Sequence, residues 1–199
     1  YVNTCGGCHG VEFMRYNSLA KGIGITDESG EVLADVVKAN LLFVGDKITD
    51  PMKTAMPKDQ SAGWFGIAPP DLSLVTRSRG VDWVYTYMKT FYADPEKTWG
   101  VNNLVFPDVG MPHVLVGLQG VQKPVYQGDK VVGLELVNQG TLSKEEYNAT
   151  ITDLVNFLAY VGEPIKLERE RLGVWVLLFL GVLLVFSYLL KREYWKDVH

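Results

Sequence analysis

The longest apolar stretch of the chain lies near its C-terminus. Residues 172–190 read LGVWVLLFLGVLLVFSYLL and contain no charged side chain. As an α-helix this segment would be about 28 Å long at ~1.5 Å per residue, which matches the hydrocarbon core of a bilayer. Charged residues flank the run on both sides, and Tyr188, Tyr194 and Trp195 are typical of the headgroup region. A buried core helix would be shorter or have a polar face. The pattern therefore predicts one transmembrane helix.

Three further elements follow from the spacing of apolar residues. Ser143 and Glu146 form a capping box. The apolar positions after it follow helical spacing until Gly162 and Pro164, which predicts a helix over 143–161 that packs across a helix expected near the N-terminus and closes the core. Weak alternation over 121–138 predicts a small β-hairpin, and residues 12–20 are expected to form a helix with Phe13, Tyr16 and Leu19 on one face.

Composition divides the chain into two parts. The 199 residues carry a formal net charge of −4, with 47% hydrophobic residues, which excludes a disordered chain. Residues 166–199 contain six basic and four acidic side chains, so residues 1–165 carry −6. An acidic chain does not fit a nucleic-acid-binding protein. We expect a domain over 1–165 and an anchor over 166–199, and, because the first residue is Tyr, a segment upstream of it that has been removed.

Both cysteines fall in one motif, Cys5-Gly6-Gly7-Cys8-His9. C-x-x-C-H is the attachment pattern of c-type haem: the two thiols bond the vinyl groups and the adjacent histidine ligates the iron. The glycines leave room beside the macrocycle and allow a tight turn. The motif predicts one covalently attached haem c, with His9 as an axial ligand, and hence a periplasmic or intermembrane location.

Other uses of two cysteines fit less well. A thioredoxin-like pair requires a βαβ setting, which is absent from the pattern. A structural zinc site requires four ligands, and the only other histidines are His113 and His199. A disulfide between residues three apart would be strained.

The second axial ligand decides whether the sixth coordination position of the iron is filled or is open to an external ligand. Met14 is too near His9 to reach the opposite face of the ring, Met88 reads as core, and Met52 and Met56 read as surface or gap-filling residues. Met111 lies in NNLVFPDVGMPH, where Pro107, Gly110 and Pro112 prevent a helix and hold an ordered loop. Met111 is the favoured sixth ligand; His113 and an open site are the alternatives.

A second stretch is expected to line the haem. Ala68-Pro69-Pro70-Asp71-Leu72-Ser73 is a stiff turn that we expect to wall the ring edge, with Pro70 in contact. Arg77 and Arg79 follow it. An arginine fork suits a haem propionate, although the two charges could equally be solvated.

These motifs, in this order and over nearly the whole chain, resemble the cytochrome c1 family, and proteobacterial members more than mitochondrial ones. The resemblance implies a mainly α, class I cytochrome c-like haem domain with inserted loops, Met111 as sixth ligand, and Arg79 before Arg77 as the propionate partner. The segment that the family carries upstream of the motif is not in this sequence.

The resemblance also implies a function. The chain would relay single electrons from a Rieske iron–sulfur protein to a soluble or tethered cytochrome c, beside a cytochrome b subunit, in the dimeric quinol–cytochrome c oxidoreductase of a respiratory or photosynthetic chain. It would need no acid–base or nucleophilic residue of its own. A free-standing anchored electron shuttle and an open-site haem sensor or peroxidase are the alternatives.

The distribution of charged residues predicts the membrane side of the haem domain and its attraction for a partner protein. The haem domain is expected on the periplasmic side of the inner membrane, or in the intermembrane space of a mitochondrion, with Lys191, Arg192 and Lys196 in a cytoplasmic tail. Basic residues on the other flank make this charge bias weak. Acidic groups near 27–35 and at 94–96 are candidates for steering a basic partner.

Overall fold

The haem-attachment segment leads into a short strand. The computed structural model describes residues 1–197, which form two compact units divided after Gly162. In the first unit, β1 (Val11–Arg15) precedes α1 (Tyr16–Gly22). The helix predicted over 12–20 is therefore wrong for its first four residues, and Phe13 is 74% exposed while Tyr16 and Leu19 are buried. Strand pairing with β2 (Pro51–Met52), and the hydrogen bonds that the Glu12 and Phe13 N–H groups donate to Asp71 and Ser73, outweighed the local helical pattern.

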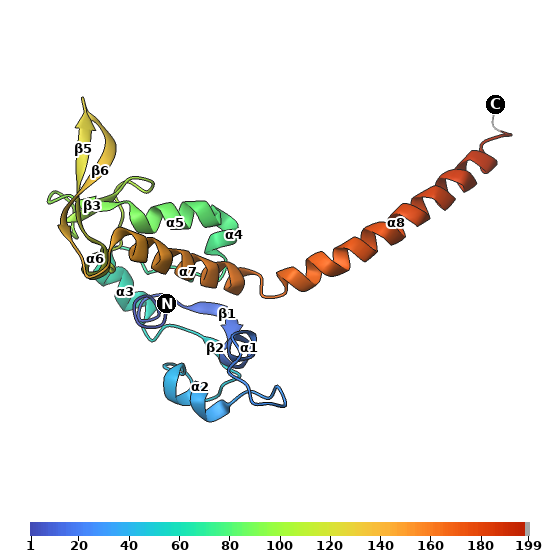
Figure 1. Ribbon diagram of the computed structural model, residues 1–199, viewed down its shortest axis with the longest axis horizontal. Helices are drawn as coiled ribbons and strands as arrows, with labels where there is room; N and C mark the ends of the chain where they lie inside the picture. Colours follow the sequence, from blue (N-terminus) through green and yellow to red (C-terminus); the bar gives the residue numbers. More distant parts are fainter. Residues whose placement is uncertain (198–199) are drawn as a thin grey trace. The chain divides into compact units, whose positions relative to one another are not determined.

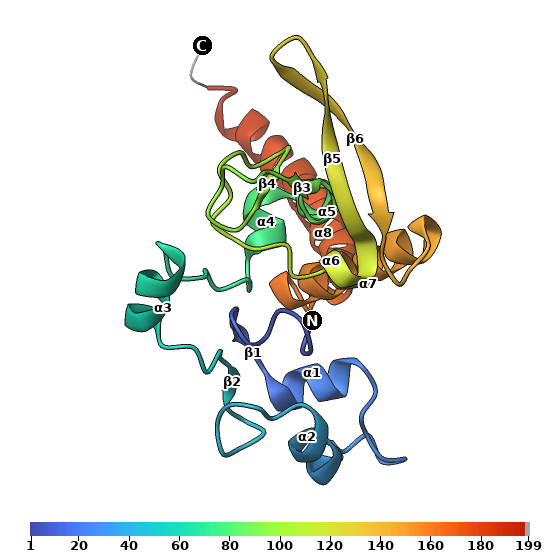
Figure 2. The ribbon, with the colours of Figure 1, turned by 90° about the vertical axis from the view of Figure 1, so that its left-hand side faces the viewer.

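The remaining N-terminal and central helices are short. They are α2 (Ala34–Asn40), α3 (Lys58–Phe65), α4 (Val75–Arg79), α5 (Val81–Lys89) and α6 (Val116–Gln119). Between α5 and α6, β3 (Phe91–Ala93) pairs antiparallel with β4 (Val101–Asn103). Figures 1 and 2 show long loops joining these elements.

The long helix α7 (Lys144–Gly162) organises the core of the first unit. It packs against α4, α5 and β1, and its apolar face includes Ile151 and Leu158, both buried. The predicted capping box is present: the Glu146 N–H donates to Ser143 Oγ at 3.3 Å, and the Ser143 N–H donates to Glu146 Oε2 at 2.9 Å. Helix α7 thus contacts β1, the strand that follows the attachment motif, whereas the predicted packing partner was a helix.

The predicted hairpin is also present and is longer than expected. Strands β5 (Gly120–Gln127) and β6 (Lys130–Gln139) pair antiparallel, with register shifts near Val121 and Val125. Figure 2 shows their turn projecting from the rest of the first unit, while the base of β5 contacts β3.

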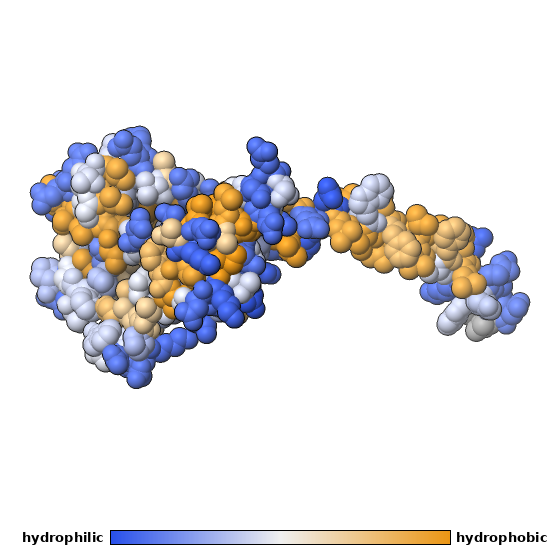
Figure 3. All heavy atoms as spheres, turned by 90° about the horizontal axis from the view of Figure 1, so that it is seen from below, coloured by the Kyte–Doolittle hydropathy of each residue, from blue (hydrophilic) through white to orange (hydrophobic). Residues whose placement is uncertain are grey.

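The second unit contains one helix, α8 (Lys166–Tyr194). Its 29 residues include a window with a mean hydropathy of 2.5, and it is the one helix, among residues 1–197, that is long and apolar enough to cross a membrane. Its middle is covered by apolar side chains, with hydrophilic ones near both ends (Figure 3). Length and composition thus match the predicted span at 172–190.

Candidate haem-binding site

The attachment motif is wound into a tight turn by its own backbone. The Tyr1 carbonyl accepts N–H groups from Thr4, Cys5 and Gly6, and the Cys5 carbonyl accepts those of Cys8 and His9 at 3.1 and 2.9 Å. Both cysteines are free thiols; Cys5 is buried and Cys8 half-buried. The two thiols are therefore available for thioether bonds, and the structure contains no disulfide between them.

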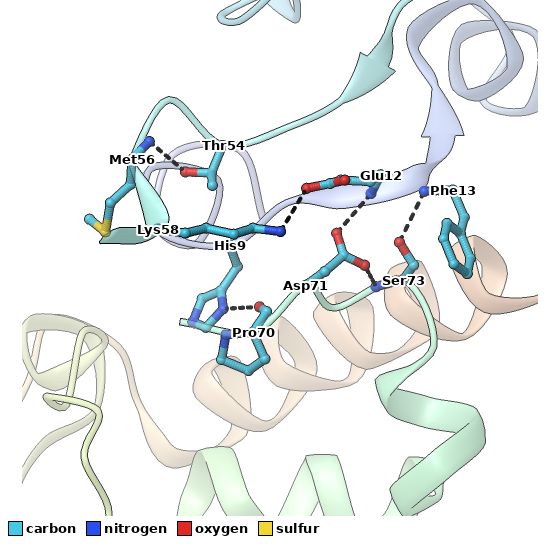
Figure 4. Close-up of polar contacts among 9 residues, drawn as sticks. All are labelled: His9, Glu12, Phe13, Thr54, Met56, Lys58, Pro70, Asp71 and Ser73. Carbon is cyan, nitrogen blue, oxygen red and sulfur yellow. Dashed lines mark hydrogen bonds and ion pairs between the residues drawn. The ribbon is translucent and has the colours of Figure 1, made fainter. Parts of the chain in front are cut away.

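His9 is held in one orientation by the predicted stiff turn. Its Nδ1 atom lies 2.7 Å from the carbonyl oxygen of Pro70 (Figure 4). A carbonyl only accepts, so Nδ1 carries the proton and Nε2 keeps its lone pair for a metal. Pro70 thus contributes its backbone oxygen to the site.

Two side chains that follow Pro70 fasten this turn to β1. Asp71 Oδ2 accepts the Glu12 N–H at 2.8 Å, Asp71 Oδ1 accepts the Ser73 N–H at 2.9 Å, and Ser73 Oγ accepts the Phe13 N–H at 3.1 Å. Figure 4 shows the bonds of Glu12 and Phe13 side by side between the two segments, and the Asp71–Ser73 bond within the turn. We call Asp71 and Ser73 the brace. The brace fixes the distance between β1, which follows His9, and the Pro70 carbonyl, which orients the His9 ring.

The loop that carries Met111 is shaped by two buried asparagines. Asn103 Oδ1 accepts the N–H groups of Val105 and Phe106 at 3.0 and 3.2 Å, and Asn103 Nδ2 donates to the Tyr87 carbonyl at 2.8 Å. Asn102 Oδ1 accepts the Asp108 N–H at 2.8 Å. The loop is thus ordered by side-chain-to-backbone bonds as well as by its prolines.

Asp108 adds a strained position to this loop. Its φ of +61° is the one positive value at a non-glycine residue in the described chain. The Asp108 carboxylate pairs with Lys97 at 2.6 Å and raises the pKa of that ammonium. The ion pair and the Asn102 bond together hold the backbone in this conformation.

Met111 itself is half-buried, and its sulfur has a donor. The Tyr87 hydroxyl lies 3.4 Å from Met111 Sδ. Burial raises the pKa of Tyr87 to about 12, so the hydroxyl keeps its proton at neutral pH. The other methionines have other roles: Met14, Met52 and Met88 are buried in the core, and Met56 is half-buried. Met52 was expected either at the surface or as a gap-filling residue, and the structure places it in the core.

Arg79 and the Met111 loop share one aromatic cluster. The Arg79 guanidinium carbon lies 5.1 Å from the centre of the Trp83 ring and 5.9 Å from that of Phe106. Arg77 is exposed. Within residues 1–197 neither guanidinium pairs with a carboxylate, so both remain available to an acidic group supplied from outside the chain.

Residues 65–70 connect the two parts of the candidate site, the loop that carries Met111 and the turn that orients His9. A Cβ at Gly110, the residue before Met111, would contact the Ile67 side chain at 3.7 Å and the Phe65 carbonyl at 3.9 Å. Residues 65–70 therefore run from the methionine loop to the carbonyl that orients His9.

His113, the alternative ligand, lies in a different environment. It is buried with its ring stacked on Phe91 at 4.8 Å, and burial lowers its pKa to about 4. The stack leaves the in-plane lone pair of the imidazole free, so it does not by itself exclude His113 as a ligand.

Four positions in this site were not expected from the sequence: the brace residues Asp71 and Ser73, Asn103, and Tyr87. Asp-x-Ser and Asn-Asn beside proline-rich turns are typical of side-chain-to-backbone bonds, so a signal existed for three of them. Tyr87 carried no such signal because its bond to Met111 is purely tertiary.

The donor set fits haem c. Two free thiols precede a histidine whose Nε2 keeps a lone pair, and a thioether and two arginines without carboxylate partners lie on the adjoining segments. No group of three or more His, Cys, Asp or Glu residues that could hold a metal ion by itself occurs in the described residues. The two thiols and the Nε2 lone pair of His9 suit a cofactor that carries its own metal.

Comparisons with known proteins agree with this chemistry. The Cytochrome C1 family model matches residues 1–198. The chain is 50% identical to cytochrome c1 of Allochromatium vinosum, with all of this chain and 82% of that protein covered. It is 45% identical to a protein of Nitrosomonas europaea named ammonia monooxygenase gamma subunit, with all of this chain and 80% of that protein covered.

More distant relatives extend to mitochondria. Cytochrome c1 of Schizosaccharomyces pombe is 26% identical, with all of this chain and 64% of that protein covered. The chain belongs to the cytochrome c1 family, whose members carry covalently bound haem c and transfer electrons in an oxidoreductase complex.

Proposed function

We propose that this chain is the membrane-anchored cytochrome that relays single electrons from a Rieske iron–sulfur protein to a soluble or tethered cytochrome c. The proposal places it beside a cytochrome b subunit in a dimeric quinol–cytochrome c oxidoreductase. The observation that carries it is the 2.7 Å contact between His9 Nδ1 and the Pro70 carbonyl, which leaves one imidazole nitrogen for iron directly after two free thiols.

The chain's own residues hold and tune the cofactor. Cys5 and Cys8 attach it, and His9 and Met111 are the proposed axial ligands. Arg79, and after it Arg77, is the proposed partner of a propionate. Haem c, when bound, supplies one-electron oxidation and reduction. No side chain is assigned as a general acid, base or nucleophile.

The anchor gives the proposal its topology. We assign α8 to the inner membrane, the haem domain to the periplasmic side, and the residues after 190 to the cytoplasmic side. The division at residue 162 supports treating residues 1–165 as the haem domain and 166–199 as the anchor.

Some of the acidic groups proposed to steer the acceptor also accept structural hydrogen bonds. Asp27 Oδ1 accepts the N–H groups of Ser29 and Glu31, and Asp94 accepts from Asn102, so both also have structural roles. Glu28, Asp35 and Glu96 are exposed. If the negative domain attracts a basic acceptor, the bimolecular rate falls steeply as salt rises, and a flat dependence contradicts steering.

Ligation is tested with Met111→Leu in the detergent-solubilised holoprotein. We expect loss of the methionine-to-iron band of the oxidised haem and a lower midpoint potential, because a thioether ligand raises the potential. The matched control is Met56→Leu, since Met56 is also half-buried and is not assigned as a ligand. A wild-type band in Met111→Leu would remove Met111 from the proposal. Carbon monoxide binding to the reduced wild type at neutral pH would support an open iron site.

Mild detergent extraction of native membranes tests whether this chain is a subunit of a larger oxidoreductase complex. Co-purification with a multi-haem b subunit, seen as haem b and haem c in one redox-difference spectrum, supports the relay. Recovery of haem c alone, at all detergent strengths, would support a free-standing anchored shuttle.

A further inference from the structure

We propose that Tyr87 is a positioning residue for the sixth ligand: its hydroxyl donates to the Met111 sulfur, orients it, and raises the reduction potential of the haem. The inference rests on the proposed ligation by Met111. The donor–acceptor distance is 3.4 Å, which is within range for a sulfur acceptor.

The phenol ring is fixed by packing on three sides. Tyr87 stacks on Trp83 with ring centres 5.1 Å apart and an interplanar angle of 13°. Phe91 and Phe106 meet it edge-on at 5.1 and 6.4 Å. These contacts fix the direction of the ring, so the hydroxyl points at the sulfur without further ordering.

The backbone ties donor and acceptor to one frame. The Tyr87 carbonyl accepts Asn103 Nδ2 at 2.8 Å, and Asn103 Oδ1 shapes the loop that continues to Met111. The same tyrosine is therefore joined to the ligand loop through its main chain and to the ligand atom through its side chain. Met111 Sδ is the one hydrogen-bond partner of the Tyr87 hydroxyl within residues 1–197.

The effect on potential follows from the charge on the sulfur. A hydrogen bond to a thioether draws electron density away from the lone pairs, so the sulfur donates less to iron. Weaker donation destabilises the ferric state more than the ferrous state, which raises the potential.

The test compares Tyr87→Phe with Tyr85→Phe in the detergent-solubilised holoprotein. Tyr85 lies on the same helix, and its hydroxyl accepts from Lys89 Nζ at 3.1 Å instead of contacting Met111. Phenylalanine at 87 keeps the aromatic contacts and removes one oxygen. Haem content, the methionine-to-iron band, and the midpoint potential are measured for each protein.

We expect Tyr87→Phe to keep its haem and its methionine band, with the band displaced and the midpoint shifted to lower potential. Tyr85→Phe should match the wild type in both. If Tyr87→Phe also matches the wild type while Met111→Leu loses the band, this inference fails and the ligation stands. If Met111→Leu keeps the band, the ligation fails, and this inference with it.

A measurement on unaltered Tyr87 covers the case in which Tyr87→Phe is not recovered with haem. In proton spectra of the reduced wild type, we expect a slowly exchanging tyrosine hydroxyl proton with an Overhauser contact to the Met111 methyl group. Its absence would overturn the inference.

Discussion

The Nδ1 atom of His9 lies 2.7 Å from the carbonyl oxygen of Pro70, 61 residues further along the chain. A hydrogen bond of this kind fixes both the tautomer and the ring plane of a metal-binding histidine. Its geometry depends on where the backbone of residue 70 lies, and that position depends on the brace of Asp71 and Ser73 against β1. Several expectations follow from this arrangement and from the loop that carries Met111.

Asp71→Ala should loosen the brace. The variant removes acceptors for two backbone N–H groups, those of Glu12 and Ser73. Hydrogen bonds to charged groups contribute about 1.5–3 kcal/mol, so we expect about 2 kcal/mol less unfolding free energy. Chemical denaturation of the holoprotein measures this. Asp153→Ala, an exposed position on α7, is the control and should change the value little. Equal stabilities for the two variants would show that the brace does not matter.

Asn103→Ala should destabilise the Met111 loop locally, so that the loop loses its structure at a lower temperature than the domain unfolds. Asn103 is 1% exposed, and its loss leaves the N–H groups of Val105 and Phe106 without their acceptor. Each lost hydrogen bond costs about 0.5–1.5 kcal/mol. On heating, the methionine-to-iron band should disappear well below the far-ultraviolet transition. Exposed Asn138→Ala is the control. Coincident transitions in Asn103→Ala would contradict local loosening.

Arg79→Gln should lower the midpoint potential of the haem more than Arg77→Gln does. A nearby positive charge favours the reduced cofactor, which carries one more electron. Both arginines are exposed, and the Arg79 guanidinium lies over the rings of Trp83 and Phe106, the second of which belongs to the methionine loop. Redox titration of the two variants at equal ionic strength measures the difference. A larger shift for Arg77→Gln would reverse the order proposed for the propionate.

The capping box should make stability depend on pH in the acid range. Hydrogen bonds from the Ser143 backbone and side chain lower the pKa of Glu146 below its ordinary value of 4.5. A lowered folded-state pKa stabilises the fold above 4.5 and loses that contribution as pH falls through the lowered value. Thermal unfolding of wild type and Glu146→Gln should therefore differ at pH 7 and converge in acid.

The neighbouring Glu145 gives the matched control for the cap. It is exposed and makes no hydrogen bond or ion pair within residues 1–197. Glu145→Gln should follow the wild type across the same pH range. Ser143→Ala should cost about 1 kcal/mol, the usual value of an N-cap side chain. A constant difference between wild type and Glu146→Gln from pH 7 to 3 would contradict the pH argument.

The helices and strands that could be predicted are those whose sequence pattern lies within the element itself. The capped helix α7, the hairpin of β5 and β6, and the apolar run within α8 all follow from periodicity, caps and turn residues that lie inside the element itself. The exception is residues 12–15, which read as helix and form a strand. There, acceptors from Asp71 and Ser73 and pairing with β2 outweighed local preference.

The amino-acid sequence alone determined the covalently attached cofactor and the long apolar helix near the C-terminus. Two cysteines and a histidine at fixed spacing suffice for covalent haem attachment, and 19 uncharged residues suffice to match a bilayer, because each depends on residues close together in the chain. Only the tertiary structure brought His9 to the Pro70 carbonyl, Arg79 to Trp83 and Phe106, and Tyr87 to the Met111 sulfur. These contacts join separate segments, and the packing of those segments fixes distances that no local spacing encodes.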